Sequence, residues 1–292
     1  MIPKKFKEDH MEKFNTFNYH ITNRCNYDCR YCFGKFKGQP DPTIDDTRTV
    51  VDSIASYFTE NGIENGRINL AGGEPTLYKR LDELIDYIHS RGISVSIVTN
   101  GSRLSPERIR AWKGKVCCIG ISVDSASADT NRNIGRCCSK EVITNEQLIK
   151  ISQVIHECGI KLKINTVVSG FNINEDLSTL YRAMAPDRVK FFEMHLIDGI
   201  NDRAKDYRIT KDEFKAFCKR QDAGADETVE EPNQSMENSY LMINPGGEFQ
   251  LNDNGKYKTY GNLKFTPLCE IMKNAPLDKS RYDLRYETEV QK

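Results

Sequence analysis

Four features that would direct a protein to a membrane, to secretion or to nucleic acid are missing from this sequence. Its 42 Lys and Arg residues are matched by 42 Asp and Glu residues, so it lacks the basic excess typical of surfaces that bind polyanions. No apolar run approaches the length of a membrane span. The first sixteen residues lack both the apolar core of a signal peptide and a long amphipathic stretch. We therefore expect a cytoplasmic protein with no nucleic-acid partner and no membrane partner.

Cysteine, by contrast, is moderately abundant, with ten residues among 292. In a chain without a secretion signal we expect these residues to be thiols or metal ligands rather than disulfides. The adjacent pairs at 117–118 and 137–138 lack the spacing of ligand loops, and we interpret them as structural. A second cluster is therefore not expected.

The most informative stretch of the sequence is residues 18–37, which read NYHITNRCNYDCRYCFGKFK. Cys25, Cys29 and Cys32 form a C-x3-C-x2-C triplet within it. Three thiolates do not complete the four-ligand shell that structural zinc or a [4Fe–4S] cluster prefers. If the triplet holds such a cluster, one iron has no protein ligand and is available for chemistry. Two other interpretations remain, a zinc site in a loop and three unrelated buried thiols.

The segment NYHITNRCNYDCRYCF resembles the signature of radical S-adenosylmethionine (SAM) enzymes and, more narrowly, of the viperin family. The resemblance runs from about Phe17 to Leu251. It implies that the three cysteines hold a [4Fe–4S] cluster whose open iron chelates the amino and carboxylate groups of SAM. It also implies that the reduced cluster cleaves SAM to a 5′-deoxyadenosyl radical. Animal viperins carry a membrane-associating extension, and the lack of such a stretch here favours a soluble form.

Strand-like and helix-like segments alternate along the chain, which is typical of βα units around a parallel sheet. The expected strands are 17–22, 68–71, 93–98, 116–123, 161–168 and 188–196. The expected helices lie near 45–58, 81–88, just after 106, and near 148–155, 176–185 and 214–218. About six such units predict an α/β fold, a partial (β/α)6 TIM-like barrel short of the eight units of a closed barrel. The resemblance implies the same core.

The expected domains are an N-terminal segment (1–16), a radical SAM partial barrel (17–220) and a C-terminal extension (221–292) that closes the active site. We interpret the acidic, polar stretch 222–238 as a flexible connector. Residues 239–243 and 248–251 flank a Pro-Gly-Gly sequence and are expected to form a hairpin. The tail after Tyr260 carries weak structure signals.

Glycine and polar residues follow the expected strands at the edge where parallel α/β sheets place their sites. Gly72 and Gly73 allow the backbone to approach a ligand closely, and Glu74 can accept hydrogen bonds from an ammonium group. Taken singly, such residues are also ordinary turn or cap residues. The resemblance implies that they bind SAM, with Arg136 neutralising its carboxylate. The residues assigned to the cofactor are Tyr31, Gly72, Gly73, Glu74, Asn100, Ser122, Asp124 and Arg136.

Cations alternate with apolar residues in or directly before three expected strands, at Arg67, Lys163 and Lys190. Burying inward-facing cations costs free energy unless they bind an anion together. A triphosphate is an anion that several such cations could bind. For Arg67 and Lys190, a solvent-facing position at a strand start explains the pattern equally well. The resemblance implies a nucleoside triphosphate bound by Arg67, Lys163, Lys190, Arg285, Lys37 and Lys140. Arg67 stands where animal viperins have Lys, and Val189 replaces a Trp.

Tyr240 lies in a segment that resembles a viperin motif, which implies that it donates a hydrogen atom to a product-like radical. By itself it is an ordinary strand tyrosine. The resemblance implies a radical SAM lyase that abstracts the 4′ hydrogen of CTP, UTP or GTP, and we expect this enzyme to be a monomer. It would form the 3′-deoxy-3′,4′-didehydro analogue, an antiviral chain terminator, with a flavodoxin or ferredoxin as electron donor. Two alternatives stay open: another radical SAM enzyme of cofactor or peptide-modifying biosynthesis, and a non-catalytic iron–sulfur or zinc scaffold protein.

Overall fold

The computed structural model describes residues 12–35 and 39–290, which are organised around one ten-stranded sheet. The order of its strands is β10-β9-β8-β1-β2-β3-β4-β5-β6-β7. Strands β1 to β7 pair in parallel, β8 pairs in parallel with β1, and β9 and β10 are antiparallel. The strands are β1 (Thr16–His20), β2 (Arg67–Ala71), β3 (Ser94–Thr99), β4 (Val116–Ser122), β5 (Lys161–Val168), β6 (Arg188–Glu193), β7 (Glu227–Glu231), β8 (Met242–Ile243), β9 (Glu248–Asp253) and β10 (Lys256–Asn262). The six expected strands and the hairpin are present, and the partial-barrel fold is confirmed.

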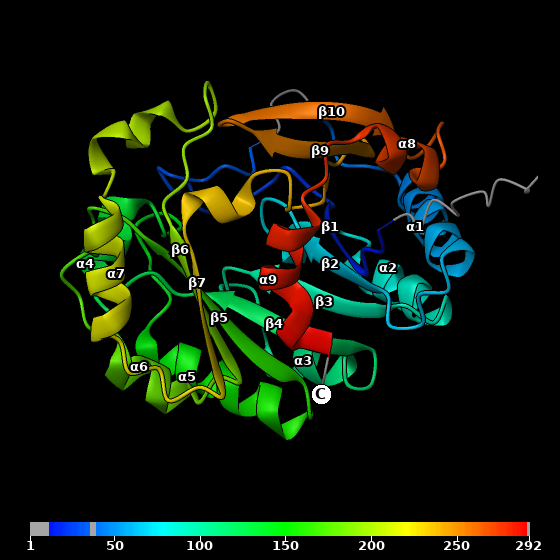
Figure 1. The fold of residues 1–292 in the computed structure, drawn as a ribbon. Coiled ribbons are helices and arrows are strands. Elements are labelled where there is room, and N and C mark those ends of the chain that lie inside the picture. The colour runs from blue at the N-terminus through cyan, green and yellow to red at the C-terminus, as the bar shows by residue number, and fades with distance from the viewer. Residues whose placement is uncertain (1–11, 36–38, 291–292) are drawn as a thin grey trace, which may run out of the picture.

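Helices cover the outer face of the parallel part of the sheet (Figure 1). The described α-helices are α1 (Ile44–Glu60), α2 (Leu81–Ser90), α3 (Pro106–Ala111), α4 (Ala128–Ile134), α5 (Asn145–Glu157), α6 (Ser178–Met184), α7 (Lys211–Arg220), α8 (Leu268–Asn274) and α9 (Lys279–Val290). Short 3-10 helices are η1 (Pro75–Leu77), η2 (Asp202–Tyr207) and η3 (Asn233–Met236). The six expected helices are present, whereas α4 was not expected. It lies in the loop after β4, where it carries the segment that leads to Arg136.

Local sequence explains where α1 begins and which face it buries. Thr43 and Asp46 form a reciprocal capping box, which satisfies backbone N–H groups at the start of the helix. Val50, Ile54 and Phe58 recur at helical spacing, and all three are buried against the sheet. The helix is therefore held by its apolar stripe, and its polar face remains toward solvent.

The parallel strands direct apolar side chains toward the helices and polar side chains toward the interior of the barrel. In β2, Ile68 and Leu70 are fully buried in the main hydrophobic core, whereas Arg67 and Asn69 line an internal cavity. Successive side chains of a strand point to opposite faces of a sheet. The cations that alternate with apolar residues in the sequence therefore mark the inner surface.

The interpretation of residues 222–238 as a flexible connector is wrong. Within this stretch β7 adds a parallel strand to the edge of β6, and η3 follows it. The exposed edge of β6 supplies backbone hydrogen-bond partners, and the acidic residue Glu231 is buried beside cations that neutralise it. Acidic composition is compatible with a strand here because the strand lies at the edge of the sheet, with most of its side chains exposed or half-buried.

The tail after Tyr260 also has more structure than its sequence signals indicated. Helix α9 bridges the two sides of the open barrel (Figure 1). The Tyr282 hydroxyl accepts a hydrogen bond from the backbone N–H of Thr16 on β1, 2.7 Å away. The carbonyl of Arg285 accepts one from Lys190 on β6, 3.0 Å away. Helix α9 is thus stabilised by docking across the sheet, which sequence propensity does not report.

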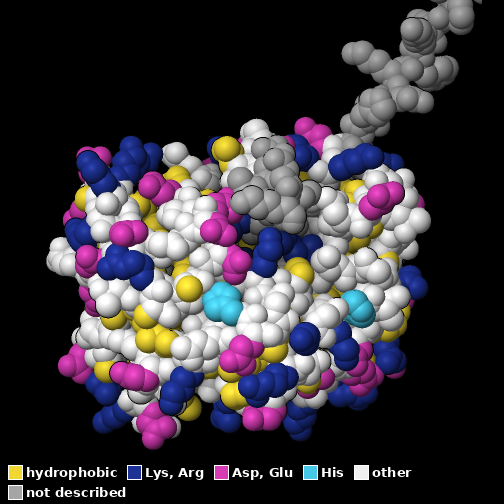
Figure 2. Space-filling model, turned by 90° about the horizontal axis from the view of Figure 1, so that it is seen from below, with side chains coloured by type: hydrophobic (Ala, Val, Ile, Leu, Met, Phe, Trp, Pro, Cys, Tyr) yellow, Lys and Arg dark blue, Asp and Glu magenta, His cyan; other side chains and the backbone are white. Residues whose placement is uncertain are grey.

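The surface at the ends where the strands begin carries charges of both signs, intermingled over the helices (Figure 2). Among the residues described, every helix is too short or too polar to cross a membrane. The division of the chain at residue 220 stays a prediction. The sheet itself is continuous across this position, because β7 pairs with β6.

Candidate active site

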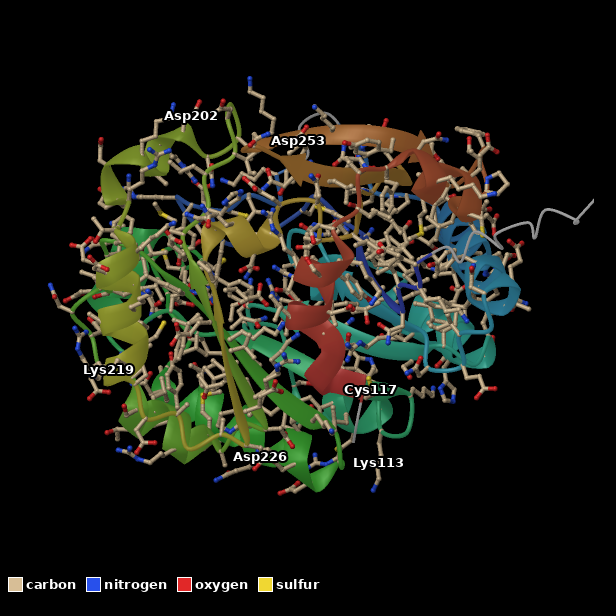
Figure 3. All side chains as sticks on the ribbon, in the orientation of Figure 1. Lys113, Cys117, Asp202, Lys219, Asp226 and Asp253 are labelled. Carbon is tan, nitrogen blue, oxygen red and sulfur yellow. The ribbon has the colours of Figure 1, made fainter. Side chains whose placement is uncertain are left out.

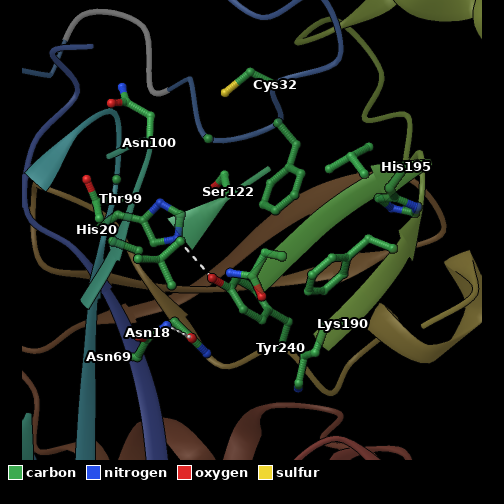
Figure 4. Close-up of a pocket in the computed structure, with 18 of the residues that line it drawn as sticks. Asn18, His20, Cys32, Asn69, Thr99, Asn100, Ser122, Lys190, His195 and Tyr240 are labelled. Carbon is green, nitrogen blue, oxygen red and sulfur yellow. Dashed lines mark hydrogen bonds between the residues drawn. The ribbon is translucent and has the colours of Figure 1, made fainter. Parts of the chain in front are cut away.

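A cavity of about 240 Å³ lies on the inner face of the sheet. Side chains of alternating strand residues line it, as expected for one face of each strand. On β1 these are Thr16, Asn18 and His20, on β2 Arg67, Asn69 and Ala71, and on β5 Lys163, Asn165 and Val167. Figure 4 shows Cys32 at one end of this space and Lys190 at the other. The two ends differ in chemistry and are described in turn.

The loop after β1, residues 23–34, forms the end of the cavity at the carboxyl edge of the sheet, and we call it the cysteine rim. Cys25, Cys29 and Cys32 all line the cavity. Two backbone hydrogen bonds tie the loop to the end of α4, from the N–H of Asp28 to the carbonyl of Gly135 and from the N–H of Arg30 to that of Ile134. The shape of the rim therefore depends on a segment about a hundred residues away.

Close backbone contacts at glycines allow this arrangement. A Cβ at Gly135 would stand 2.4 Å from the Asp28 carbonyl oxygen, and one at Gly73 would stand 2.2 Å from the Arg24 carbonyl oxygen. Gly135 also has a φ of 92°, in the left-handed region that L side chains rarely adopt. Both glycines are therefore required for the loop to pack against its neighbours.

The polar loop after β6 holds the rim from its other side. The Arg203 guanidinium on η2 donates to both carboxylate oxygens of Asp28, at 2.6 and 2.9 Å, and to the carbonyl of Cys29 at 3.2 Å. The Asn201 side-chain amide donates to the carbonyl of Tyr31 at 2.9 Å. These bonds fix the backbone on either side of the central cysteine.

A buried hub of hydrogen bonds lies beside the cysteines. Asp124 is 1% exposed and accepts from the Tyr31 hydroxyl at 2.6 Å and from the backbone N–H of Val167 at 2.7 Å. Its carboxylate also pairs with Arg136 at 2.9 Å, and Arg136 donates to the carbonyl of Ser122 at 2.6 Å. All four side chains predicted for SAM at this position line the cavity. The charges of Asp124 and Arg136 are thus paired with each other within the protein, and the Tyr31 hydroxyl is hydrogen-bonded to the same carboxylate.

Glu74 holds strand ends together rather than facing the cavity. Its carboxylate is fully buried and accepts from the Thr99 hydroxyl at 2.6 Å, from the backbone N–H of Asn100 at 2.7 Å, and from Thr76. Gly72, Gly73 and Asn100 do line the cavity. A direct contact of Glu74 with the SAM amino group stays a prediction.

The opposite end of the cavity is cationic. Arg67, Lys163, Lys190 and Arg285 line it from β2, β5, β6 and α9, and we call these four residues the cation floor. Lys190 donates to Glu231 at 2.8 Å, and Arg285 pairs with the other carboxylate oxygen of Glu231 at 2.6 Å. Burial lowers the pKa of Lys190 well below its ordinary value, because the interior penalises an isolated cation.

Lys163 differs from its neighbours in the floor. It makes no hydrogen bond or ion pair with any other residue in the described part of the chain, whereas Lys190 and Arg285 are both paired. Burial lowers its pKa, and the nearby cations Arg67 and Arg188 lower it further. An anionic ligand would relieve both effects, because it would supply the missing opposite charge.

Neutral polar side chains separate the two ends. The Asn69 amide donates to Asn18 at 2.9 Å, and the Asn18 amide donates to the Tyr286 hydroxyl at 3.0 Å. Nearer the rim, the His20 ring nitrogen Nε2 lies 3.3 Å from the Tyr240 hydroxyl (Figure 4). Burial lowers the pKa of His20 to about 3, so its imidazole is neutral near pH 7.

Comparisons with known proteins identify the family. Residues 19–184 match the radical SAM superfamily. An S-adenosylmethionine-dependent nucleotide dehydratase of Flammeovirga pacifica is 34% identical over 251 residues, which cover 82% of this chain and 83% of that protein. Another, of Psychrobacter lutiphocae, is 33% identical over 255 residues, with 82% and 84% covered. The chain belongs to this family of nucleotide dehydratases.

The fold of this nucleotide dehydratase family member is also found in a solved structure of low sequence identity. The crystal structure of Streptococcus suis SuiB bound to S-adenosylmethionine superimposes with a TM-score of 0.65 at 14% identity, covering 92% of this chain and 67% of that one. The predictions of a viperin-like radical SAM enzyme and of its two cofactors, a [4Fe–4S] cluster and SAM, are confirmed by family membership. The enzyme also requires a reductant, as radical SAM enzymes do.

The donor set of the cysteine rim fits a cluster with three protein ligands. Thiolates are the ligands that iron–sulfur clusters use, and three thiols line one cavity beside a cationic guanidinium. In residues 12–35 and 39–290, no three His, Cys, Asp or Glu side chains lie close enough to share a single metal ion. Burial raises the pKa of Cys25 to about 11 and that of Cys29 to about 12, so cluster assembly must release their protons.

Of the predicted substrate residues that the structure describes, Lys140 is the one that does not line the cavity. Lys37 lies outside the described residues. Lys140 is exposed on a turn with a φ of 70° and does not line the cavity. The remaining predicted residues, apart from Glu74, are brought together around one space: Cys25, Tyr31, Arg67, Gly72, Asn100, Asp124, Lys163, Lys190, Tyr240, Arg285 and their partners Cys29, Cys32, Gly73, Ser122 and Arg136.

Several residues of the site were missed in the sequence. Asn18 and His20 alternate with apolar residues in β1, the same signal that marked Arg67 and Lys163, and it could have identified them. Glu231 carried no usable signal, because it lies in an acidic stretch whose other carboxylates are exposed or half-buried. Asn201 and Arg203 act through loop geometry, which the sequence pattern does not encode.

Proposed function

We propose that this enzyme converts a ribonucleoside triphosphate to its 3′-deoxy-3′,4′-didehydro analogue. One observation supports this most strongly: a single cavity has three thiols at one end and four cationic side chains at the other. A triphosphate bound at the cation floor would direct the ribose toward the cysteine rim. The 4′ carbon of the sugar would then be the part of the substrate that faces the cofactors.

The cofactors supply the initiating chemistry: when bound, the reduced cluster and SAM give a 5′-deoxyadenosyl radical that takes the 4′ hydrogen. Cys25, Cys29 and Cys32 are the proposed cluster ligands. Asn100 and Ser122 present amide and hydroxyl groups that suit the ribose of SAM. The protein's contribution is to hold both molecules in register and to exclude water.

The cation floor is the proposed phosphate site. Guanidinium and ammonium groups form strong charge-assisted hydrogen bonds with phosphate oxygens. Lys163 is the residue best placed to take a phosphate, since it has no partner within the described chain. The Asn165 side-chain oxygen is also buried without a hydrogen-bond partner among the described residues. It lies on the same strand and lines the same cavity, where a ribose hydroxyl would satisfy it.

Tyr240 is the proposed hydrogen-atom donor. After the 4′ hydrogen is removed, the C3′–O bond breaks and hydroxide leaves, so that the sugar becomes a product-like radical cation. The Tyr240 O–H then supplies a hydrogen atom, whose electron reduces this radical to the closed-shell product and whose proton converts the hydroxide to water. The nucleotide has then lost one water, and the tyrosyl radical recovers an electron from the external donor and a proton from solvent. His20 holds the phenol at 3.3 Å and remains neutral, so it orients Tyr240 without adding charge.

Tyr240→Phe tests this role. We expect 5′-deoxyadenosine to form at close to the wild-type initial rate, because the cleavage of SAM does not involve the phenol. We expect dehydrated nucleotide per 5′-deoxyadenosine to fall by about tenfold or more, as when a proton-transfer group is lost. Quantifying both products by liquid chromatography in single-turnover reactions gives the ratio. An unchanged ratio would show that Tyr240 does not donate the hydrogen atom.

The experiment that tests the function is an anaerobic assay of the reconstituted enzyme. Dithionite and SAM are supplied with CTP, UTP, GTP or ATP separately, and 5′-deoxyadenosine and nucleotide products are measured. We expect one triphosphate to stimulate 5′-deoxyadenosine formation and to lose the mass of one water. Stimulation by none of the four, with SAM still cleaved, would contradict a nucleotide substrate.

Further parts of the proposal concern the surroundings of the enzyme. The electron donor would be of flavodoxin or ferredoxin type, and the enzyme would act as a monomer in the cytoplasm. Its product lacks a 3′ hydroxyl and would terminate nucleic-acid synthesis, which gives an antiviral role. Size-exclusion chromatography with light scattering checks the oligomeric state.

A further inference from the structure

Glu231, at the end of β7, lies between two members of the cation floor. One carboxylate oxygen accepts from the Lys190 ammonium at 2.8 Å, and the other is 2.6 Å from the Arg285 guanidinium. All three residues are at most 3% exposed. We propose that Glu231 is a positioning residue of the triphosphate site, which holds Lys190 and Arg285 side by side as cations. This inference rests on the proposed function, which assigns the floor to phosphate binding.

The geometry joins three elements that are distant in sequence. Lys190 comes from β6, Glu231 from β7 and Arg285 from α9, and the Arg285 carbonyl also accepts a hydrogen bond from Lys190. The ring of Tyr286 lies 5.4 Å from the Lys190 nitrogen. The Arg285 guanidinium stands 5.3 Å from the centre of the Tyr240 ring. Glu231 thus links the phosphate end of the cavity to the proposed hydrogen donor.

Burial explains why these cations need a carboxylate. Removing an ammonium group from water is costly, and a buried lysine tends to lose its proton instead. Burial lowers the pKa of Lys190, and the charge of Glu231 opposes this effect. Burial also pushes the pKa of Glu231 upward, but the charges of Arg285 and Lys190 lower it on balance. The carboxylate is therefore ionised and supports the charge of its lysine partner.

Other charges around Lys190 would not replace Glu231. Most of the groups that face it are cations, which disfavour its protonation further. Its charged or titratable neighbours are Lys163 on β5, Arg188 on β6, Glu231 on β7, and Arg285 and Tyr286 on α9, and Arg188 is in turn next to Arg67 on β2 and Glu227 on β7. Glu227 already pairs with Arg188 at 3.2 Å. Without Glu231, Lys190 is the group that loses its proton, because an arginine stays charged in proteins.

Two effects of Glu231 on a bound triphosphate oppose each other, and pH separates them. The carboxylate repels the anion, but it also keeps the lysine charged. At low pH, Lys190 is protonated with or without Glu231, so removing the carboxylate costs little or tightens binding. As pH rises through the depressed pKa of Lys190 in the variant, the variant loses a cation that the wild type retains. The deficit in triphosphate affinity should therefore grow with pH.

The test compares Glu231→Gln with Glu230→Gln in the reconstituted, anaerobic enzyme. Glu230 precedes Glu231 on the same strand but is exposed, so it controls for a lost carboxylate. Binding of inorganic triphosphate and of CTP, UTP and GTP is measured by calorimetry between pH 6 and pH 8.5. We expect Glu231→Gln to bind about tenfold more weakly at pH 8.5, or about 1.4 kcal/mol, with a smaller deficit at pH 6. Glu230→Gln should match the wild type at every pH.

Glu231→Asp provides a second test of the inference in case Glu231→Gln does not fold. Its shorter carboxylate cannot reach both cations at the observed distances, so we expect weaker binding with a deficit that is constant over pH. Wild-type affinity in Glu231→Asp would overturn the inference. So would a Glu231→Gln enzyme that binds as tightly as Glu230→Gln at pH 8.5. The proposed function would instead be contradicted if the wild-type enzyme bound none of the triphosphates. That result needs no variant, so it is distinguishable from failure of the inference about Glu231.

Discussion

The cysteine rim and the cation floor lie at opposite ends of one cavity but are held in different ways. Backbone hydrogen bonds and close glycine contacts fix the rim, for example from Asp28 to the carbonyl of Gly135. Side-chain ion pairs between separate strands and α9 fix the floor, for example from Lys190 to Glu231. The rim therefore depends on backbone shape, whereas the floor depends on charge balance. Substitutions should affect the two ends through different measurable quantities.

The largest effect is expected at the rim. Cys29→Ala should abolish 5′-deoxyadenosine formation and lower iron content after reconstitution, because two thiolates cannot retain the cluster. Iron and sulfide analysis with the anaerobic assay measures both quantities. Cys117→Ala is the control, since Cys117 lies where β4 begins, at the opposite edge of the sheet from the cysteine rim (Figure 3). Full iron content in Cys29→Ala would show that this residue is not a ligand.

The next largest effect is expected at the floor. Lys163→Met should raise the KM for the triphosphate by about tenfold or more, the cost of losing a hydrogen bond to a charged group. The free energy of unfolding should not fall, because an apolar side chain replaces a half-buried cation that has no partner in the described chain. Steady-state kinetics and thermal unfolding provide the two measurements.

Lys161→Met is the matched control for this variant. Lys161 lies on the same strand with its side chain exposed, two residues before Lys163. It should leave both KM and the free energy of unfolding near the wild-type values. If both variants raise KM equally, general electrostatic attraction rather than a contact at Lys163 would explain the effect.

The sequence predicted the rim more completely than the floor, and the comparison explains why. The rim ligands lie within eight consecutive residues, Cys25 to Cys32, so their spacing is visible without the fold. Three cations of the floor, Arg67, Lys163 and Lys190, were visible as alternation within strands, whereas Arg285 on α9 was predicted from the resemblance alone. Their neutralising partner Glu231 was not, because its burial arises only when β7 pairs with β6. Helix α9 was missed for the same reason, since its contacts join it to elements that are distant in sequence, such as β1, β6 and η3.

Gly135→Ala tests whether backbone shape controls the rim. The left-handed φ alone costs roughly 1–2 kcal/mol in the free energy of unfolding. We expect a further loss, because the new Cβ would stand 2.4 Å from the Asp28 carbonyl oxygen. Gly159→Ala is the control, since Gly159 also has a left-handed φ, 69°, but open space around its Cβ position. Only Gly135→Ala should also lower iron content. Equal iron content in both variants would show that Gly135 does not control the shape of the cysteine rim.

The smallest effect is expected from Arg203→Ala, which removes the side-chain bonds to Asp28 and the Cys29 carbonyl. Exposed ion pairs contribute about 1 kcal/mol or less to stability, so thermal unfolding should change little. The rate at which iron is lost to a chelator should rise, because the bonds that Arg203 makes hold the backbone of a cluster ligand. Arg182→Ala is the control, since Arg182 forms a similarly exposed pair with Asp222. If both variants lost iron at the same rate, the bonds of Arg203 would not be needed to hold the rim, and the backbone hydrogen bonds, the glycine contacts and the bond from Asn201 would be sufficient.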